Sequence, residues 1–397
     1  KIASILYPNK IEKKFAVTGT NGKTSVSSFV YQIWRKQDYK AAFVGTLGVI
    51  SNNNRISKTN LTTADVITNH KILYKLNNSK CKNIIFEASS IGLHQKRLYP
   101  IKFDVVAFTN LSKDHLDYHK NINNYKNTKS LLFSHYTKKK SIAVINSDSK
   151  YSNFFFKNCR DNQISILDFG KKADFLKILQ IKKIENGFKI KINLKKKQFE
   201  VEFKCSSQFE IYNQLCAILM VFGKKLDQKH MHFLRGLKNP DGRLEKIYDK
   251  NDIKVYVDYA HTADALSKVL YALKQITLGK LFLVFGCGGD RDRTKRSRMT
   301  KEALKYSDQI FITDDNPRFE DPEQIISDML KGLNKKNLEK VKVIRGRSKA
   351  IKFAINQLSK SDILLIAGKG HEDYQIIKNK HYNFSDKRIA KDFLRLS

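Results

Sequence analysis

Short apolar runs of strand length alternate along this chain with amphipathic segments of helix length, and this alternation constrains the fold more than any other feature. Strand–helix units of this kind pack into a mostly parallel sheet with helices over its faces, so the pattern predicts an α/β fold. Residues 14–20 (KFAVTGT) are expected to form the first buried strand. Further strands are predicted at residues 83–89, 104–110, 141–148, 252–259, 280–288, 309–315, 341–346 and 362–368.

The pattern of apolar and polar residues changes between residues 186 and 205, where the two kinds alternate strictly (GFKIKINLKKKQFEVEFKC). Such alternation is typical of antiparallel strands with one solvated face, so a hairpin at a sheet edge is predicted. A helix containing NQLCAILMVFG follows, and Pro240 and Gly242 then mark a linker before a second series of strands and helices. We therefore predict a P-loop-type central domain over residues 1–236 and a Rossmann-like C-terminal domain over residues 237–397.

The chain of 397 residues carries a net charge of +37 and five scattered cysteines. The cysteines form no C-x-x-C pair, which fits a reducing cytosol and argues against a zinc site or a disulfide framework. No apolar run approaches the roughly 20 residues that a membrane-spanning helix needs, so a cytoplasmic protein without a membrane partner is expected. The densest lysine runs lack the interleaved aromatic residues of a base-stacking surface, so we expect no nucleic-acid partner.

The motif TGTNGKT, residues 18–24, predicts a phosphate-binding loop. The standard Walker A spacing would need glycine at Val17, so the loop is a shortened form. Its glycines let backbone N–H groups approach phosphate oxygens, and the start of the following helix adds partial positive charge. Lys23 can reach the terminal phosphates and Thr24 can ligate Mg²⁺, whereas an ordinary tight turn would need neither residue. The apolar face of the following helix is predicted to consist of Val26, Phe29, Val30, Ile33 and Trp34.

The loop and the motifs after it resemble those of the Mur ligases, over nearly the whole chain from Lys14 to Gln375. The folylpolyglutamate synthetases share the loop, and the later motifs favour the Mur ligases, in particular the tripeptide synthetases that add the third residue of the peptide. The matching motifs are TGTNGKT, LTTAD, EASSIGLHQKRL, TNLSKDHLDYH, YKNTKSLLF, YNQLCA, PDGRLE, VDYAHTADAL, GCGGDRDRTKR, DDNPRFEDP and GKGHEDYQ.

The resemblance implies ATP and Mg²⁺ as cofactors. ATP would be bound by Gly19, Thr20, Asn21, Gly22, Lys23, Thr24, Asn213, Arg243 and Asp258. The metal ligands would be Thr24, Glu87, His115 and, if carbamylated, Lys129. The implied catalytic residues are Lys23, Glu87, His115 and Lys129. Taken alone, Glu87 reads as a strand-end cap, His115 as a loop residue, Lys129 as a solvated lysine and Asp258 as a turn residue.

The resemblance also implies an acceptor site for UDP-N-acetylmuramoyl-L-alanyl-D-glutamate, formed by Thr62, Thr63, Ser89, Gln95 and Arg97. Two positions depart from the family pattern, in which proline usually replaces Ala64 and histidine usually replaces Ile91. Neither departure removes an expected contact, although either could loosen its loop.

The segment DDNPRFEDP carries the specificity hypothesis. A turn followed by a helix N-cap at Asp321 explains most of it but leaves Arg318 without a structural reason. An arginine forms paired hydrogen bonds with a carboxylate, and in this family D-N-P-R marks enzymes that add meso-2,6-diaminopimelate. The residues implied to bind this amino acid are Arg291, Asp315, Asn316, Pro317, Arg318, Gly368 and Glu372.

The implied function is an ATP-dependent amide ligase of peptidoglycan precursor synthesis that works through an acyl phosphate. The alternatives that stay open are the lysine-adding counterpart, another Mur ligase, a folylpolyglutamate synthetase, or a basic nucleic-acid-binding NTPase. The chain begins just before the phosphate loop, so the family's N-terminal uridine-binding domain is expected to be missing, and a monomer is expected.

Overall fold

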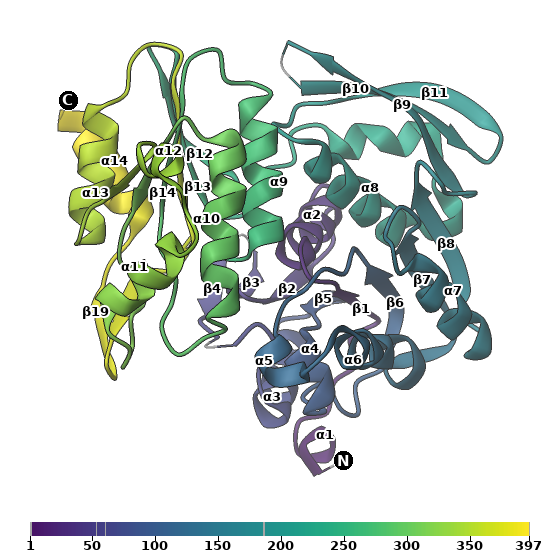
Figure 1. The fold of residues 1–397 in the computed structure, drawn as a ribbon. Helices are drawn as coiled ribbons and strands as arrows, with labels where there is room; N and C mark the ends of the chain where they lie inside the picture. Colours follow the sequence, from purple (N-terminus) through teal and green to yellow (C-terminus); the bar gives the residue numbers. More distant parts are fainter. Residues whose placement is uncertain (1, 53, 60, 186, 397) are drawn as a thin grey trace. The chain divides into compact units, whose positions relative to one another are not determined.

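The computed structural model describes residues 2–52, 54–59, 61–185 and 187–396. It divides the chain into two compact units, residues 1–238 and residues 239–397, which we call the N-terminal unit and the C-terminal unit (Figure 1).

The N-terminal unit is built on an 11-stranded sheet of order β11-β10-β9-β8-β7-β6-β1-β5-β2-β3-β4. The strands from β9 to β2 in this order pair in parallel, and antiparallel strands extend the sheet at both edges. The strands are β1 (Lys13–Thr18), β2 (Ala41–Gly45), β3 (Gly48–Ser51), β4 (Asn54–Ser57), β5 (Asn83–Glu87), β6 (Phe103–Phe108), β7 (Thr137–Asn146), β8 (Ser165–Gly170), β9 (Leu176–Ile184), β10 (Gly187–Leu194) and β11 (Lys197–Phe203).

Helices cover both faces of this sheet. They are α1 (Ile2–Leu6), α2 (Lys23–Arg35), α3 (Val66–Asn78), α4 (Ser90–His94), α5 (Leu116–His119), α6 (Ile122–His135), α7 (Ser152–Asp161) and α8 (Gln208–Phe222), followed by the 3₁₀ turns η1 (Gly223–Lys225) and η2 (Gln228–Leu234). Figure 1 shows α8 running beneath the long β9–β11 ribbon.

The alternation of side chains along β1 separates two hydrophobic cores. Phe15 and Val17 point into the core formed with α2 and α8, whereas Ala16 points into the core formed with α3, α6 and α7. All five residues predicted for the apolar face of α2 are buried. Strand β1 lies between β5 and β6. The carboxyl end of β1 is therefore at a point where the strand order reverses, and ligands of parallel α/β sheets usually bind at such a switch point.

The C-terminal unit has a six-stranded sheet of order β12-β13-β17-β14-β15-β16, parallel except for the β12–β13 pair, and a separate two-stranded ribbon, β18–β19. Its strands are β12 (Glu245–Lys250), β13 (Ile253–Asp258), β14 (Leu281–Phe285), β15 (Gln309–Ile312), β16 (Val341–Val343), β17 (Ile363–Ala367), β18 (Tyr374–Ile377) and β19 (Lys380–Asn383). Its helices are α9 (Ala263–Lys274), α10 (Thr294–Tyr306), α11 (Pro322–Leu330), α12 (Lys335–Leu338), α13 (Arg347–Asn356) and α14 (Asp386–Leu396).

The predicted α/β class, with a mostly parallel first sheet and an antiparallel hairpin at its edge, is confirmed. The hairpin is β10–β11 at the sheet edge, although residue 186, where the prediction began it, lies outside the described residues. The second antiparallel edge, β3–β4, was not predicted, because each strand has only four residues and the exposed strand β4 (NRIS) lacks the apolar alternation seen in β10–β11.

Candidate functional site

The phosphate loop, residues 19–24, joins β1 to α2 through two glycines in conformations that side chains rarely adopt. Gly19 has φ 155° and Gly22 has φ 88°. A Cβ atom on Gly19 would overlap the hydroxyl of Thr109, and one on Gly22 would lie 2.6 Å from Asn213 Oδ1. Gly22 is also the N-cap of α2 and supplies no capping side chain, so the partial positive charge of the helix start favours an anion there.

Two lysines converge on one carbonyl of this loop. Lys23 Nζ lies 2.9 Å from both Gly19 O and Thr20 O, and Lys129 Nζ from helix α6 lies 2.8 Å from Gly19 O. Lys129 is buried, which rules out the solvated reading of this residue. Burial and the charge of Lys23 hold the pKa of Lys129 well below its ordinary value.

Behind the loop, Thr24 from α2 meets Glu87 from the end of β5. Both residues are buried, and Thr24 Oγ1 donates to Glu87 Oε2 at 2.9 Å. The neighbouring Thr46 donates its N–H to Glu87 Oε1 at 2.9 Å, and its hydroxyl lies 3.1 Å from Oε2. The sequence therefore brings Thr24 and Glu87 together, as the metal hypothesis requires.

His115 stands beside the same lysines at the N-cap of α5. Its pKa is lowered, chiefly by desolvation and further by Lys129 and Lys23, while Asp114 opposes the shift with a carboxylate 3.5 Å from Nε2. The His115 ring lies 6.4 Å from that of Tyr125, whose hydroxyl is 3.2 Å from Thr20 Oγ1. The lowered pKa favours the neutral imidazole, which is the form in which a histidine ligates a metal ion.

The donors around the loop fit a hard cation. No group of three or more His, Cys, Asp or Glu side chains that could hold a metal occurs in the part of the chain that the structure describes. Mg²⁺ does not need one, because it is usually held by one or two carboxylates together with waters and substrate phosphates. The Thr24 hydroxyl and the Glu87 carboxylate are oxygen donors of the required kind, whereas unmodified Lys129 is not.

The other residues predicted for ATP lie in both units. Asn213, on α8, packs its side chain against Gly22. In the C-terminal unit, Arg243 stacks over the Tyr259 ring at 4.5 Å. Asp258 is buried, and its two oxygens accept backbone N–H groups of Leu244 and Ala260 at 2.5 and 2.7 Å. Burial raises the pKa of Asp258, and Arg243 partly offsets that rise. The contacts of Asp258 are those of a turn-stabilising carboxylate.

The residues predicted for the acceptor form one connected cluster after β5. Thr63 Oγ1 donates to Glu87 O at 2.7 Å and accepts from Ser89 N at 3.0 Å. Arg97 donates to Thr63 O at 2.9 Å and to Gln95 Oε1 at 2.9 Å. Thr62 connects this cluster to Glu87 through Thr46: the hydroxyls of Thr62 and Thr46 lie 3.1 Å apart, and Thr46 contacts the Glu87 carboxylate.

In the C-terminal unit, the residues predicted for diaminopimelate gather at the carboxyl ends of β14, β15 and β17. Arg318 Nη1 donates to Gly289 O at 2.8 Å, beside exposed Arg291. Desolvation and the charge of Arg291 lower the pKa of Arg318, while Asp315 and Glu372 counteract part of the shift. The cations Arg291 and Arg318 are therefore close enough to the anions Asp315 and Glu372 for their charges to interact, and we call this group of side chains the arginine pocket.

Buried Lys369 organises the anionic side of this pocket. Its ammonium lies 2.8 Å from Asn316 Oδ1, 3.3 Å from Glu372 Oε2 and 3.6 Å from Asp315 Oδ1. Desolvation and Asp315 raise the pKa of Glu372, against the lowering effects of Lys369 and Asn316. Burial opposes the charge of Asp315, yet Lys369 and Arg347 together hold the pKa of that carboxyl below its ordinary value. The Asp315 carboxylate therefore faces the buried cations Lys369 and Arg347. It also lies close to Gly368, where the Cβ of any other residue would be 2.9 Å from Asp315 Oδ2.

Sequence reasoning missed Thr46, Tyr125 and Lys369. Thr46 lies in none of the matching motifs, and Tyr125 lies in YKNTKSLLF, where the resemblance assigned a role only to Lys129. Both residues become relevant through their contacts with Glu87 and Thr20. Lys369 could have been found, since a lysine between two glycines (GKG) directly after a buried strand is an unusual place for a solvated side chain.

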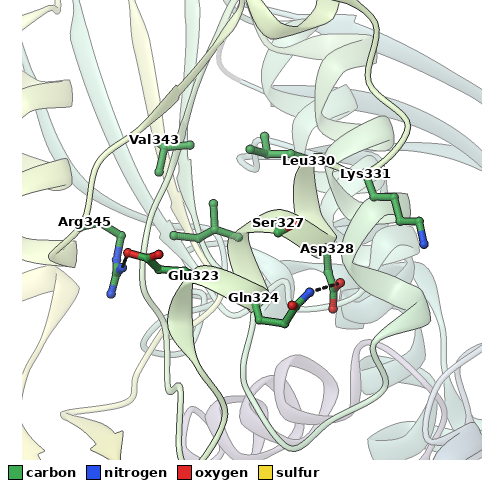
Figure 2. A pocket seen from close by; sticks show the side chains of 9 residues that line it. Glu323, Gln324, Ser327, Asp328, Leu330, Lys331, Val343 and Arg345 are labelled. Atoms are coloured by element: carbon green, nitrogen blue, oxygen red, sulfur yellow. Dashed lines mark hydrogen bonds and ion pairs between the residues drawn. The ribbon is translucent and has the colours of Figure 1, made fainter.

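A separate hollow of about 720 Å³ lies along α11 and the end of β16. Figure 2 shows two side-chain pairs at this hollow: Arg345 forms an ion pair with Glu323 at 3.4 Å, and Gln324 donates to Asp328, one turn further along α11, at 3.1 Å. Its lining residues are Glu323, Gln324, Ile326, Ser327, Asp328, Leu330, Lys331, Val343 and Arg345. None of them is a predicted site residue.

The phosphate loop at the switch point of a mostly parallel sheet defines the chain as a phosphate-loop α/β protein. Family models narrow this class: residues 17–221 match the Mur ligase middle domain, and residues 242–370 match the Mur ligase glutamate ligase domain. This chain belongs to the Mur ligase family. No helix in the described ranges, 2–52, 54–59, 61–185 and 187–396, is long and apolar enough to cross a membrane.

Two curated relatives are similar over almost the whole chain, and both are named UDP-N-acetylmuramoyl-L-alanyl-D-glutamate--2,6-diaminopimelate ligase. The one from Rickettsia typhi is 40% identical, covering 98% of this chain and 79% of the relative. The one from Aquifex aeolicus is 39% identical, covering 98% and 78%. A solved structure of a ligase with this name is 34% identical, with a TM-score of 0.67 over 99% of this chain and 80% of that one. A folylpolyglutamate synthase from Mycobacterium tuberculosis, solved with ADP and AMPPCP, has a TM-score of 0.76 over 92% of this chain and 91% of that one; at 16% identity it shows the fold alone.

Proposed function

We propose that this chain is an ATP-dependent ligase that joins meso-2,6-diaminopimelate to UDP-N-acetylmuramoyl-L-alanyl-D-glutamate. The observation that carries the proposal is the meeting of Thr24 with Glu87 behind a loop on which Lys23 and Lys129 converge. The names of the relatives support the choice of substrates.

The reaction must bring a carboxylate onto a polyphosphate, and the two anions repel strongly in a partly dry cleft. Gly19 to Thr24, together with Asn213, would cradle ATP, with the ammonium of Lys23 against the terminal phosphates. Thr24, Glu87, His115 and a carbamylated Lys129 would hold Mg²⁺, which when bound neutralises phosphate charge and orients the transferred group. In the C-terminal unit, Arg243 would meet phosphate charge, and Asp258, besides supporting its turn, would accept ribose hydroxyls.

The environment of Lys129 supports its modification. An amine adds to CO₂ only when it is unprotonated, and burial beside Lys23 favours the unprotonated form. Addition forms an N–C bond and releases a proton, and it converts a buried amine into an oxygen donor for a cation.

The chemistry then proceeds as three bond changes. The γ-carboxylate of the D-glutamyl residue, oriented by the cluster around Thr62, Thr63, Ser89, Gln95 and Arg97, attacks the γ-phosphorus, and ADP leaves. The amine of diaminopimelate attacks the acyl phosphate. The tetrahedral intermediate expels phosphate and leaves an amide.

The arginine pocket suits the amino-acid head at the far end of diaminopimelate. Arg318 and Arg291 would bind its carboxylate, and Glu372 would bind its ammonium. Asn316, Gly368 and Pro317 would shape this pocket, and Asp315 would act through Lys369. In this proposal the N-terminal unit supplies the phosphate loop and binds the acceptor. The C-terminal unit binds the amino acid and supplies Arg243 and Asp258 to the nucleotide, and the enzyme works as a cytoplasmic monomer.

The test is a ligation assay on the full chain with ATP, the acceptor and one amino acid at a time, with the product identified by mass spectrometry. The expected result is a tripeptide product with diaminopimelate, and ADP formed in equal amount. Preference for lysine, or activity only with a folate, would replace the proposal by one of those alternatives. Nucleic-acid binding that survives physiological salt, without ligation, would favour the basic NTPase instead.

A further inference from the structure

The two arginines of the pocket sit on two loops that touch backbone to backbone. The first loop, residues 286–292, carries Arg291, and the second, residues 313–321, carries Arg318. Gly289 N donates to Asn316 O at 2.9 Å, and Arg318 Nη1 donates back to Gly289 O at 2.8 Å. A Cβ atom on Gly289 would overlap the carbonyl of Pro317, so the approach is as close as glycine allows.

Two features of this arrangement oppose the bonds between the loops. Arg291 and Arg318 carry like charges, and the charge of Arg291, after desolvation, lowers the pKa of Arg318. In addition, Asp290 (φ 51°) and Arg318 (φ 54°) are non-glycine residues in the left-handed region, which persists only where the surroundings enforce it. Strand β18 and the residue after it hold Arg318 on one side, since Arg318 N donates to Ile376 O at 3.2 Å and Lys378 N donates to Arg318 O at 2.7 Å. A further contact holds the two loops against each other.

Arg296 of α10 and Glu320 of the second loop supply that contact. Arg296 is fully buried and binds Glu320 through both nitrogens, Nη1 to Oε1 at 2.7 Å and Nη2 to Oε2 at 2.6 Å. Glu320 Oε2 also accepts Asp290 N of the first loop at 3.1 Å, and Asp290 Oδ2 accepts Phe319 N at 3.2 Å. The carboxylate of Glu320 thus joins its own loop to the first loop, through Asp290 N, and to Arg296 and Arg293 at the start of α10.

We propose that Arg296 and Glu320 form a clamp that sets the spacing of Arg291 and Arg318, and so act as positioning residues for selection of the amino acid. Neither residue touches the substrate in this account; both act through the two pocket arginines. The inference rests on the proposed function, because the selected ligand is the amino-acid head of diaminopimelate.

The chain offers a matched control in Asp328 of α11. Asp328 Oδ2 lies 2.8 Å from Nη1 of the same Arg296 and 3.2 Å from Arg293 Nε. Its remaining bond, to Gln324, faces the hollow along α11 (Figure 2). Glu320→Gln and Asp328→Asn each remove one negative charge that pairs with the Arg296 guanidinium. Only Glu320→Gln also weakens a hydrogen bond to the first loop, the one from Asp290 N.

The experiment is steady-state kinetics of the full chain carrying each substitution, with diaminopimelate, lysine and ATP varied in turn. For Glu320→Gln we expect the KM for diaminopimelate to rise about 10-fold and the preference over lysine to fall, with the KM for ATP unchanged within about 2-fold. For Asp328→Asn every constant should stay within about 2-fold of the parent. If Glu320→Gln fails to fold, Glu320→Asp, which keeps the charge and shortens the reach, should give the same split.

Equal effects of the two substitutions, or a parallel rise in the KM for ATP, would overturn the clamp while leaving the ligase intact. An unmodified chain that ligates no diaminopimelate would instead overturn the proposed function, and the clamp with it. The two failures are therefore distinguished by the unmodified protein.

Discussion

The phosphate loop of the N-terminal unit and the arginine pocket of the C-terminal unit solve the same problem, anion recognition, in different ways. The phosphate loop relies on backbone: two glycines, one helix start and a carbonyl shared by two lysines. The arginine pocket relies on side chains from three strand ends, held by buried ion pairs such as Lys369 with Glu372 at 3.3 Å. A backbone site suits any polyphosphate, whereas a side-chain site can distinguish one amino acid from another.

The comparison predicts that damage to the loop abolishes chemistry and damage to the pocket changes selectivity. The largest effect is expected for Lys23→Ala. Loss of the cation aimed at the terminal phosphates should reduce kcat/KM by about 10²- to 10³-fold. Lys23 is only partly buried and donates to the loop carbonyls of Gly19 and Thr20, so its removal should change the melting temperature little. Initial rates and thermal melts check this, and near-normal turnover would refute the loop assignment.

The next largest effect is expected for Arg318→Lys. Lysine keeps the charge but loses the paired geometry, so the KM for diaminopimelate should rise by about 10- to 100-fold, the worth of a charged hydrogen bond. The KM for ATP should not change, which separates the pocket from the loop. Competition between diaminopimelate and lysine measures the selectivity, and an unchanged ratio would contradict the role given to Arg318.

Lys129→Met tests whether the loop trades stability for function. Folding lowers the pKa of Lys129. At a pH between the pKa of the folded state and the ordinary lysine pKa, the lysine is neutral when folded and protonated when unfolded, so unfolding takes up a proton. The free energy of unfolding therefore rises with pH across this range. Removing the lysine in CO₂-free buffer should therefore raise the melting temperature near neutral pH, by about 2–4 °C per kcal/mol, with a smaller gain near pH 10. Activity should be lost. A lower melting temperature at both pH values would indicate that the bond to Gly19 outweighs the desolvation.

The smallest effects are expected for substitutions of the aspartates that cap one helix in each unit. Asp65 caps α3 by accepting from Ile67 N and Thr68 N, and Asp321 caps α11 by accepting from Glu323 N. Replacing either by alanine should cost about 1 kcal/mol of unfolding free energy. Neither should alter kcat or the KM for diaminopimelate. Denaturant melts of the pair provide the baseline against which the site variants are compared.

How far the sequence predicts each site follows from the same contrast. Gly22, Lys23 and Thr24 are contiguous between a strand and a helix, so their cooperation could be predicted, as could the helix start at Asp321. The burial of Lys129 could not be predicted from local pattern, because its ammonium contacts Gly19, which is distant in sequence, whereas the GKG sequence directly after β17 offered a local signal for Lys369. Asp258 shows the opposite case: taken alone, its position indicates a turn residue, and both of its oxygens do accept backbone N–H groups, while the nucleotide role implied by the resemblance stays a prediction.

The central claim is that the cationic loop lets a carboxylate attack the terminal phosphate of ATP. It is tested most directly with acceptor carrying ¹⁸O in the γ-carboxylate of its D-glutamyl residue, turned over with ATP and diaminopimelate. An acyl phosphate moves one of those oxygens onto phosphorus, so the account predicts ¹⁸O in the released inorganic phosphate in proportion to amide formed. Amide formation with unlabelled phosphate would contradict it.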